Sequence, residues 1–535
     1  MSQSPPISLQ VDQADRKHIL LVFAGLMVAM LLASLDQMIF STALPTIVGD
    51  LNGVDHMLWV TTAYILASTI MLPVYGKLGD QIGRKSLFIF AIAVFIAGSI
   101  IGGLAGDMTW LIVGRTVQGL GGGGLMILAQ AIIADVVPAR QRGKYMGIMG
   151  GVFALSTIAG PLLGGWFTEG IGWRWAFWMN VPLGLLAIAS AAFFLQLSKP
   201  PRRRLDLDIA GMVLIGVAST CLVLTTSLAG SSYAWNSPVI IGLMVASLIA
   251  GYSFFAVERR AAEPIMPMQL FKQRNFNLTT GAGLIIGIAM FGAMAYMPTY
   301  LQMVTGASAT QSGLLMLPMM AGLLATSIGS GQLVSKTGRY KWLPITGTAI
   351  VAGALYLLST MSPDTPVPVL CGYLAIMGIG LGMGMQLLVL IVQDAFPASW
   401  VGTATAANNY FRQIGAALGS AIVGSLFVSR LSSALTATLP PSDGAGSSNS
   451  FTPSLVKSLP PEVQSIIVNA YSDALTPIFL LLVPIVLVAV LLLCFVHEKP
   501  LSTTIERDIL PESLEIDGRS SVLLNTNGVI DMTEI

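Results

Sequence analysis

Residues 76–85 read GKLGDQIGRK, and residues 331–339 read GQLVSKTGR. Both stretches are short charged loops that follow a long apolar run, and their first glycines are 255 residues apart. The same interval separates Gly160 from Gly415 in two later apolar runs. Self-similarity at a fixed spacing marks a chain built from repeated structural units. The chain is therefore predicted to contain two related halves, an arrangement typical of proteins that alternate access to a central path.

The sequence around these loops is strongly apolar. Of the 535 residues, 54% are hydrophobic and only 10% are charged, and the mean hydropathy is +0.77. A soluble domain carries about 25% charged residues, so this composition excludes an ordinary soluble enzyme. The chain is instead predicted to be an integral membrane protein.

Fourteen apolar runs are long enough to cross a bilayer, because a spanning helix needs about 20 such residues. We predict an all-α membrane fold with six helices in each half, at residues 19–196 and 276–497, and two inserted helices in a linker at 197–275. The runs lie near residues 19–43, 57–76, 86–106, 109–133, 145–168, 174–196, 208–229, 238–257, 276–302, 311–334, 342–360, 367–392, 403–428 and 474–496.

The basic residues fall almost entirely on one side of this arrangement. Of the 27 lysines and arginines, 22 lie in segments on the same side as both chain ends. Positively charged loops resist translocation, so both termini are predicted to be cytoplasmic. The expected location is the plasma membrane, in a bacterium the inner membrane.

The remaining segments carry few signals for ordered structure. The outer loop at residues 429–473 is rich in Ser, Pro and Gly, and the acidic tail at 498–535 has no apolar periodicity, so both are predicted to be disordered. Residues 1–18 are predicted to form a cytoplasmic tail. The net charge of +1 gives no reason to expect a nucleic-acid partner.

Three charged residues lie deep within the apolar runs: Asp36, Arg115 and Arg412. A charge in the bilayer core costs about 3 kcal/mol, so a deep ionisable residue is a functional candidate. Asp36 and Arg115 lie at similar depth on oppositely directed helices, and Gln118 follows one helical turn after Arg115. Desolvation and a neighbouring arginine shift the pKa of a carboxyl in opposite directions, which suits reversible protonation near neutral pH. These three residues are predicted to couple transport to protons; the alternative for Asp36 is a helix-capping role.

Arg412 has no obvious acidic partner in the sequence. It either lines the substrate path or joins helices together with its flanking amides. Aromatic, methionine and amide side chains near polar groups suit an adaptable pocket. The candidates for the substrate path are Met38, Trp59, Tyr64, Tyr296, Tyr300, Gln302, Asn408, Tyr410 and Arg412.

Motifs for nucleotide, metal or covalent chemistry are incomplete. Residues 119–124, GLGGGG, match a dinucleotide-binding spacing, but they lie inside an apolar run with no preceding strand and no acid about 20 residues later. Residues 83–86, GRKS, lack the order of a P-loop. The three cysteines lie in apolar runs and the three histidines are isolated. We therefore predict no catalytic residue, no metal site and no cofactor.

Four motifs together resemble the major facilitator superfamily, specifically its 14-helix drug:proton antiporter branch. They are LDQMIFSTALPTI at 35–47, GKLGDQIGRKS at 76–86, RTVQGLGGG at 115–123 and STIAGPLLGG at 156–165. The resemblance covers roughly residues 15–430. It implies a monomeric, proton-coupled multidrug efflux protein in which Asp36 carries the proton and Arg115 assists its transfer.

The resemblance also implies which residues control the gate between the halves. Asp80 and Arg84 would hold the cytoplasmic ends of the halves together, and the bend at Gly160 and Pro161 is associated with export. The full set of implied gating residues is Gly76, Asp80, Gly83, Arg84, Gly160, Pro161, Gly164 and Gly165.

The chain departs from the family pattern in its second half. Ser335 occupies the position that corresponds to Asp80, and no second acid lies deep in the last six apolar runs. This favours neutral or zwitterionic amphiphiles over strongly cationic drugs. We expect a proton-coupled exporter of bulky amphipathic compounds, surrounded by membrane lipid. The alternatives are an exporter of an endogenous lipid, siderophore, polyamine or amino acid, a membrane receptor that does not transport, and a membrane enzyme.

Overall fold

The computed structural model describes residues 13–503 apart from 52, 54–55, 198–207, 231, 439–455 and 457–458. This part of the chain is almost entirely helical, and fourteen spans within it are long and apolar enough to cross a membrane. The predicted all-α membrane fold with fourteen spans is confirmed. A helix satisfies its own backbone hydrogen bonds, which is why uninterrupted apolar sequence folds this way in lipid.

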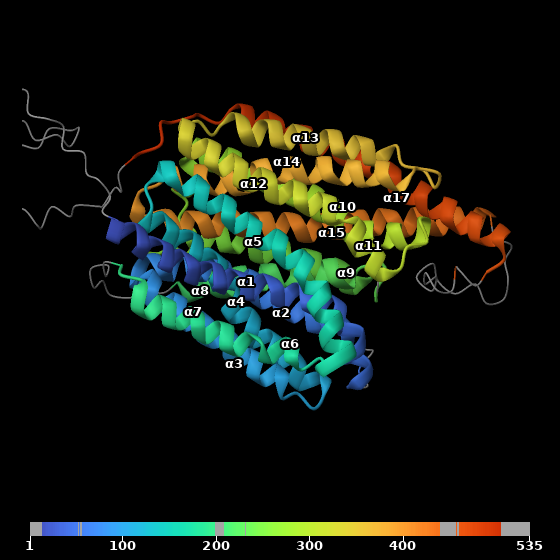
Figure 1. Ribbon diagram of the computed structural model, residues 1–535, viewed down its shortest axis with the longest axis horizontal. Coiled ribbons are helices and arrows are strands. Elements are labelled where there is room, and N and C mark those ends of the chain that lie inside the picture. Colours follow the sequence, from blue (N-terminus) through green and yellow to red (C-terminus); the bar gives the residue numbers. More distant parts are fainter. Residues whose placement is uncertain are drawn as a thin grey trace, which may run out of the picture.

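The helices are long and most run the full length of the bundle (Figure 1). Two spans are broken near one end, where α6 precedes α7 and α11 precedes α12. The bounds are α1 Gln13–Asp50, α2 Met57–Ile82, α3 Arg84–Gly103, α4 Met108–Val136, α5 Ala139–Trp166, α6 Trp175–Trp178, α7 Asn180–Phe194, α8 Ile209–Leu228, α9 Pro238–Glu258, α10 Arg274–Val304, α11 Ala309–Leu315, α12 Leu317–Thr337, α13 Trp342–Ser359, α14 Val367–Asp394, α15 Val401–Thr438 and α17 Pro461–Cys494.

The helices form two packed groups joined by a linker pair. In Figure 1 the first group, α1 to α7, occupies the lower part of the bundle, and α10 to α17 occupy the upper part. Helices α5 and α12 pack together across the boundary, as do α2 and α15. The linker helix α8 contacts both α2 and α15. Both ends of the described chain lie at one end of the bundle, which we call the termini end.

Several helices extend beyond the predicted apolar runs. The predicted loop at 429–473 is wrong at both edges, because α15 continues to Thr438 and α17 already begins at Pro461. Helix α1 likewise begins at Gln13, inside the predicted tail. An apolar run marks the part of a helix that contacts lipid, whereas polar helix formers continue the same helix beyond the membrane.

The acidic tail is ordered where it begins. Glu498 Oε1 accepts hydrogen bonds from the backbone N–H groups of Tyr340 and Lys341, at 2.7 and 3.1 Å. The backbone N–H of Lys499 donates to the Tyr340 hydroxyl at 3.0 Å, and the backbone N–H of Arg140 donates to the Ser502 carbonyl at 3.0 Å. The prediction of disorder from residue 498 onward is therefore wrong for 498–503, and residues 504–535 lie outside the described residues.

Candidate functional site

Asp36 lies at the centre of a buried polar cluster inside the first half. Its Oδ2 atom is 2.5 Å from Nη1 of Arg115 on α4. Its Oδ1 atom accepts hydrogen bonds from Nδ2 of Asn180 at 2.8 Å and from Nε2 of Gln118 at 3.1 Å. The exposed fractions of Asp36, Arg115 and Gln118 are 1%, 2% and 0%. The carboxylate is thus sealed from solvent, and one cation and two amides bind it.

A second set of contacts holds the partners of Asp36 in place. Gln118 Oε1 accepts a hydrogen bond from Arg115 Nη1 at 2.8 Å, and Gln118 Nε2 donates to the Ser99 hydroxyl at 2.7 Å. The Arg115 guanidinium stacks over the rings of Phe40 and Tyr64, with 4.1 and 4.3 Å from Cζ to the ring centroids. Such cation–π contacts stabilise a desolvated arginine. Nε of Arg115 is buried and has no partner among the described residues.

Close helix packing brings these side chains together. A Cβ atom at Gly114 of α4 would lie 2.7 Å from the backbone nitrogen of Gly102 on α3, and one at Gly98 of α3 would lie 2.3 Å from the backbone nitrogen of Gln118. Only glycine fits at such approaches, which are typical of small-residue interfaces in membranes. The glycines thereby bring Ser99 and Gln118 within hydrogen-bond distance.

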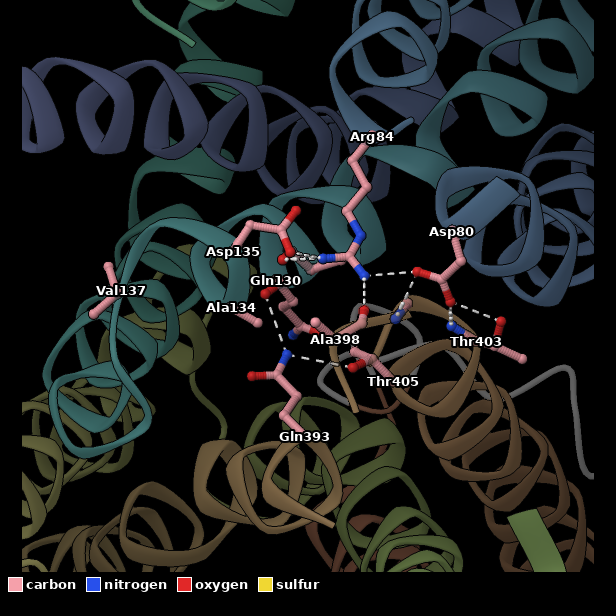
Figure 2. A network of polar contacts seen from close by, with 12 residues as sticks. Asp80, Arg84, Gln130, Ala134, Asp135, Val137, Gln393, Ala398, Thr403 and Thr405 are labelled. Carbon is pink, nitrogen blue, oxygen red and sulfur yellow. Dashed lines mark hydrogen bonds and ion pairs between the residues drawn. The ribbon is translucent and has the colours of Figure 1, made fainter. Parts of the chain in front are cut away.

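The charged loop motif lies at the termini end, where α2 ends and α15 begins. It forms contacts between the halves (Figure 2). Arg84 donates to Asp80 Oδ1 at 2.6 Å, to Asp135, and to the carbonyl of Ala398 at 2.9 Å. Asp80 Oδ2 accepts from the backbone N–H and the hydroxyl of Thr403, at 2.7 and 2.8 Å. Ala398 and Thr403 belong to the second half. Asp80 and Arg84 therefore both form hydrogen bonds across the boundary between the halves.

Helix geometry explains why Asp80 binds there. Thr403 lies in the first turn of α15, and its backbone N–H has no partner within the helix. A carboxylate at such an N-terminus gains from the hydrogen bonds and from the helix dipole. Close approach is possible because Gly76 faces α15, where an added Cβ would lie 2.3 Å from the Cβ of Ala406. Gly83 has φ of 98°, which lets the chain turn between α2 and α3.

A layer of amides lies beside this motif, also between the halves (Figure 2). Gln393 Nε2 of α14 donates to the carbonyl of Gln130 at 3.1 Å and to Thr405 Oγ1 at 3.3 Å. Asn409 Nδ2 of α15 donates to Gln130 Oε1 at 3.0 Å. We call the three amide residues Gln130, Gln393 and Asn409, together with the Thr405 hydroxyl that Gln393 bonds, the amide layer.

The α5–α12 pair makes further contacts across the boundary. Arg140 Nε and Nη2 donate to the carbonyls of Ser335 and Lys336 at 3.2 and 2.9 Å, and the Ser327 hydroxyl donates to the carbonyl of Gly147 at 3.1 Å. Arg140 and Gly147 lie in the first third of α5, Ser335 and Lys336 lie in the last turn of α12, and Ser327 lies at the middle of α12. The two halves are thus joined at the termini end.

The predicted gating residues of α5 contact α1 within the first half. An added Cβ at Gly160 would lie 2.2 Å from the Cβ of Met38, and one at Gly164 would lie 2.1 Å from Oγ1 of Thr42. Pro161 lies inside α5. Gly165 does not contact α1, because an added Cβ there would meet nothing within 4 Å. Gly160 and Gly164 therefore set the approach of α5 to the helix that carries Asp36.

The predicted substrate-path residues are distributed over separate places. Tyr64 lies beneath Arg115, while Trp59 is 40% exposed near the start of α2. Tyr300 contacts Ser472, and Gln302 donates to Ser312 at 3.2 Å. Met38, Tyr296 and Arg412 are half-buried, and Asn408 and Tyr410 are buried. Depth and residue type alone did not identify one common pocket.

Sequence reasoning missed Asn180 and Ser99 in the Asp36 cluster. Asn180 is the first residue of α7, and it is 1% exposed. A buried amide inside an apolar run is the signal that would have identified it, since buried polar groups need partners. Arg140, Gln130 and Gln393 were also missed, because their partners lie in the other half of the chain.

Comparisons with known proteins place this architecture in a family. A sequence profile described as the Major Facilitator Superfamily matches residues 26–420. The MFS-type transporter Rv1877 of Mycobacterium tuberculosis is 41% identical, over 90% of this chain and 70% of its own length. The multidrug transporter protein MdtP of Bacillus subtilis is 39% identical, over 79% of this chain and 77% of its own length.

A solved structure shares the fold. The proton:xylose symporter XylE aligns with a TM-score of 0.58 and 14% identity, over 90% of this chain and 97% of that chain. At this identity the similarity concerns the fold alone. The profile match covers most of the chain and agrees with the two-half helical architecture, so the protein belongs to the major facilitator superfamily and is a multi-pass membrane transporter rather than an enzyme.

Proposed function

We propose that the protein is a proton-coupled exporter of bulky amphipathic compounds, with both termini in the cytoplasm of a bacterial cell. The observation that carries the proposal is the Asp36–Arg115 pair, 2.5 Å apart and sealed from solvent. Efflux names among the relatives, including multidrug transporter protein MdtP, support the substrate class. The excess of basic residues in the loops at the termini end supports the orientation.

Protonation of Asp36 changes the charge balance of its cluster. The neutral carboxyl no longer attracts Arg115, while the amides of Gln118 and Asn180 can still bond its oxygens. An isolated charge is costly inside the membrane, so loss of the ion pair favours rearrangement of α1 against α4. Because α5 contacts α1 at Gly160 and Gly164, such a movement extends to the helix that faces α12.

The contacts between the halves support an assignment of the conformational state. Asp80, Arg84, Arg140 and the amide layer join the halves at the termini end. With the termini in the cytoplasm, this arrangement is the state closed to the cytoplasm. In the proposed cycle, the Asp36 cluster opens to the outside while the cytoplasmic side is closed, so that Asp36 takes a proton and substrate leaves. The proton leaves inside after the halves have rocked.

Inside-out vesicles with an acidic interior test the proposal. Wild-type protein is expected to accumulate the zwitterionic dye rhodamine B when the gradient is imposed, and Asp36→Asn at matched expression is expected not to. Asp473→Asn, which changes an exposed acid of α17, is the control and is expected to behave as wild type. Equal gradient-driven uptake in wild type and Asp36→Asn would reject coupling through Asp36.

An exporter of an endogenous lipid, siderophore, polyamine or amino acid would use the same coupling site. Accumulation of one such compound in a deletion strain, without any change in dye efflux, would identify that function instead.

A further inference from the structure

Arg412 is a deep cation with no carboxylate partner among the described residues. It lies eleven residues after Val401, the first residue of α15, or about 16 Å along the helix. This places it near the middle of a hydrocarbon core that is about 30 Å thick. The other two deep charges, Asp36 and Arg115, neutralise each other. Among the described residues deep in the spans, Arg412 is therefore the one charge that no opposite charge compensates.

The guanidinium of Arg412 has donors to spare. Its Nη2 atom donates to Oδ1 of Asn409, and no other hydrogen bond or ion pair involves its side chain in the described ranges. Arg412 is half-buried, and its nitrogen atoms are not among the sealed atoms without a partner, unlike Nε of Arg115. The free N–H groups of Arg412 are thus neither paired nor fully sealed, although they lie in the middle of a membrane span.

Arg412 lies on the face of α15 that carries two residues of the amide layer. Thr405, Asn409 and Arg412 follow one another at four- and three-residue spacing, so they lie on one helix face. The first two bond to Gln393 and Gln130 in the amide layer. Arg412 comes one turn later, on the side of the layer away from the termini end. The amide layer therefore lies between Arg412 and the termini end and joins the two halves there.

We infer that Arg412 binds the acidic group of the transported substrate, so that the substrate class is carboxylate-bearing amphiphiles. The inference rests on the proposed export function. A guanidinium offers a planar fork of N–H donors that matches a carboxylate with two parallel hydrogen bonds. Such a pair compensates the buried charge. The half-buried apolar side chains of the bundle bind the rest of the molecule, whereas a purely cationic amphiphile is repelled.

A matched dye pair tests this inference. Dansyl-phenylalanine and its methyl ester have the same apolar body and differ by one negative charge. Each is titrated by fluorescence against purified full-length protein in nanodiscs of zwitterionic lipid, with empty nanodiscs as the baseline. Wild type is expected to bind the acid about tenfold more tightly than the ester, the scale of a charge-assisted hydrogen-bonded pair.

Three variants identify the role of Arg412. Arg412→Gln is expected to lose the preference for the acid and to keep its affinity for the ester. Arg412→Lys is expected to keep only part of the preference, because it keeps the charge but lacks the fork of donors. Arg430→Gln, at an exposed site on the same helix, is the control and is expected to match wild type. If Arg412→Gln loses affinity for the acid and for the ester alike, the role of Arg412 is merely structural and the inference is overturned.

Other outcomes separate this inference from the proposed function. Equal wild-type affinity for acid and ester, or no binding of either, overturns the inference even if gradient-driven export is observed. Binding that depends on Arg412 without gradient-driven export of either dye supports the inference and rejects the proton-coupled function.

Discussion

Asp80 of the first half binds the start of α15 in the second half through Thr403. Its Oδ2 atom accepts from the backbone N–H of Thr403 at 2.7 Å and from the hydroxyl of the same residue at 2.8 Å. The two residues are separated by 323 positions in the sequence. Any movement that opens the termini end must break these two hydrogen bonds, so the contact links a loop motif to the relative position of the halves.

Replacement of Asp80 is expected to favour opening at the termini end. Asp80→Asn removes the charge that binds the N-terminus of α15 and Arg84, at a cost of about 1.5–3 kcal/mol for a hydrogen bond to a charged group. This corresponds to a shift of about tenfold or more in the ratio of open to closed states. Distances between spin labels at the termini end of α2 and α15, compared with Asp473→Asn, measure the shift; an unchanged distribution contradicts the assigned role.

The glycines of α5 offer a pair of matched substitutions. Gly160→Ala places a Cβ where Met38 Cβ would lie 2.2 Å away, whereas Gly165→Ala meets nothing within 4 Å. Overpacking of this kind costs about 1–3 kcal/mol. Gly160→Ala is therefore expected to lower the thermal unfolding temperature in detergent by several degrees and to reduce transport, and Gly165→Ala to do neither. Equal effects of the two substitutions would show that the α1–α5 approach is unimportant.

Asn180 is expected to be needed for coupling even though no loop motif contains it. Asn180→Ala removes the 2.8 Å hydrogen bond to Asp36 Oδ1, and a hydrogen bond to a charged group contributes about 1.5–3 kcal/mol. Gradient-driven dye uptake should fall about tenfold. Asn469→Ala changes an exposed amide of α17 and serves as the control. Wild-type uptake by Asn180→Ala would remove this residue from the coupling site.

The start of the C-terminal tail is expected to stabilise the loop before α13. Glu498→Ala removes two hydrogen bonds to the backbone N–H groups of Tyr340 and Lys341, so these amides should exchange with deuterium about tenfold faster or more. Burial raises the pKa of Tyr340 to about 12, so its hydroxyl stays neutral and the contact should hold across the physiological pH range. Glu462→Ala is the control, and unchanged exchange in Glu498→Ala would contradict this account.

The sequence was sufficient for the fold and for one pair of site residues. Apolar runs located all fourteen spans. The depth of Asp36 and Arg115 on oppositely directed helices predicted that they form a pair, as the structure shows. The resemblance implied that Asp80 and Arg84 join the halves, but the sequence did not identify the residues that they contact. Whether Arg84 reaches Ala398 depends on how two helix groups pack and which end is closed, and no local pattern contains that information. The ends of α15 and α17 were missed because hydropathy marks contact with lipid and not the end of a helix.

Proton release on substrate binding tests the central claim most directly. Purified protein in a weakly buffered detergent solution is mixed with rhodamine B, and the pH change is followed with an indicator. We predict that wild type releases protons when the dye binds and that Asp36→Asn binds the dye without any release, because Asp36 holds the exchanged proton. The same proton release from both proteins would contradict the assignment of Asp36 as the coupling residue.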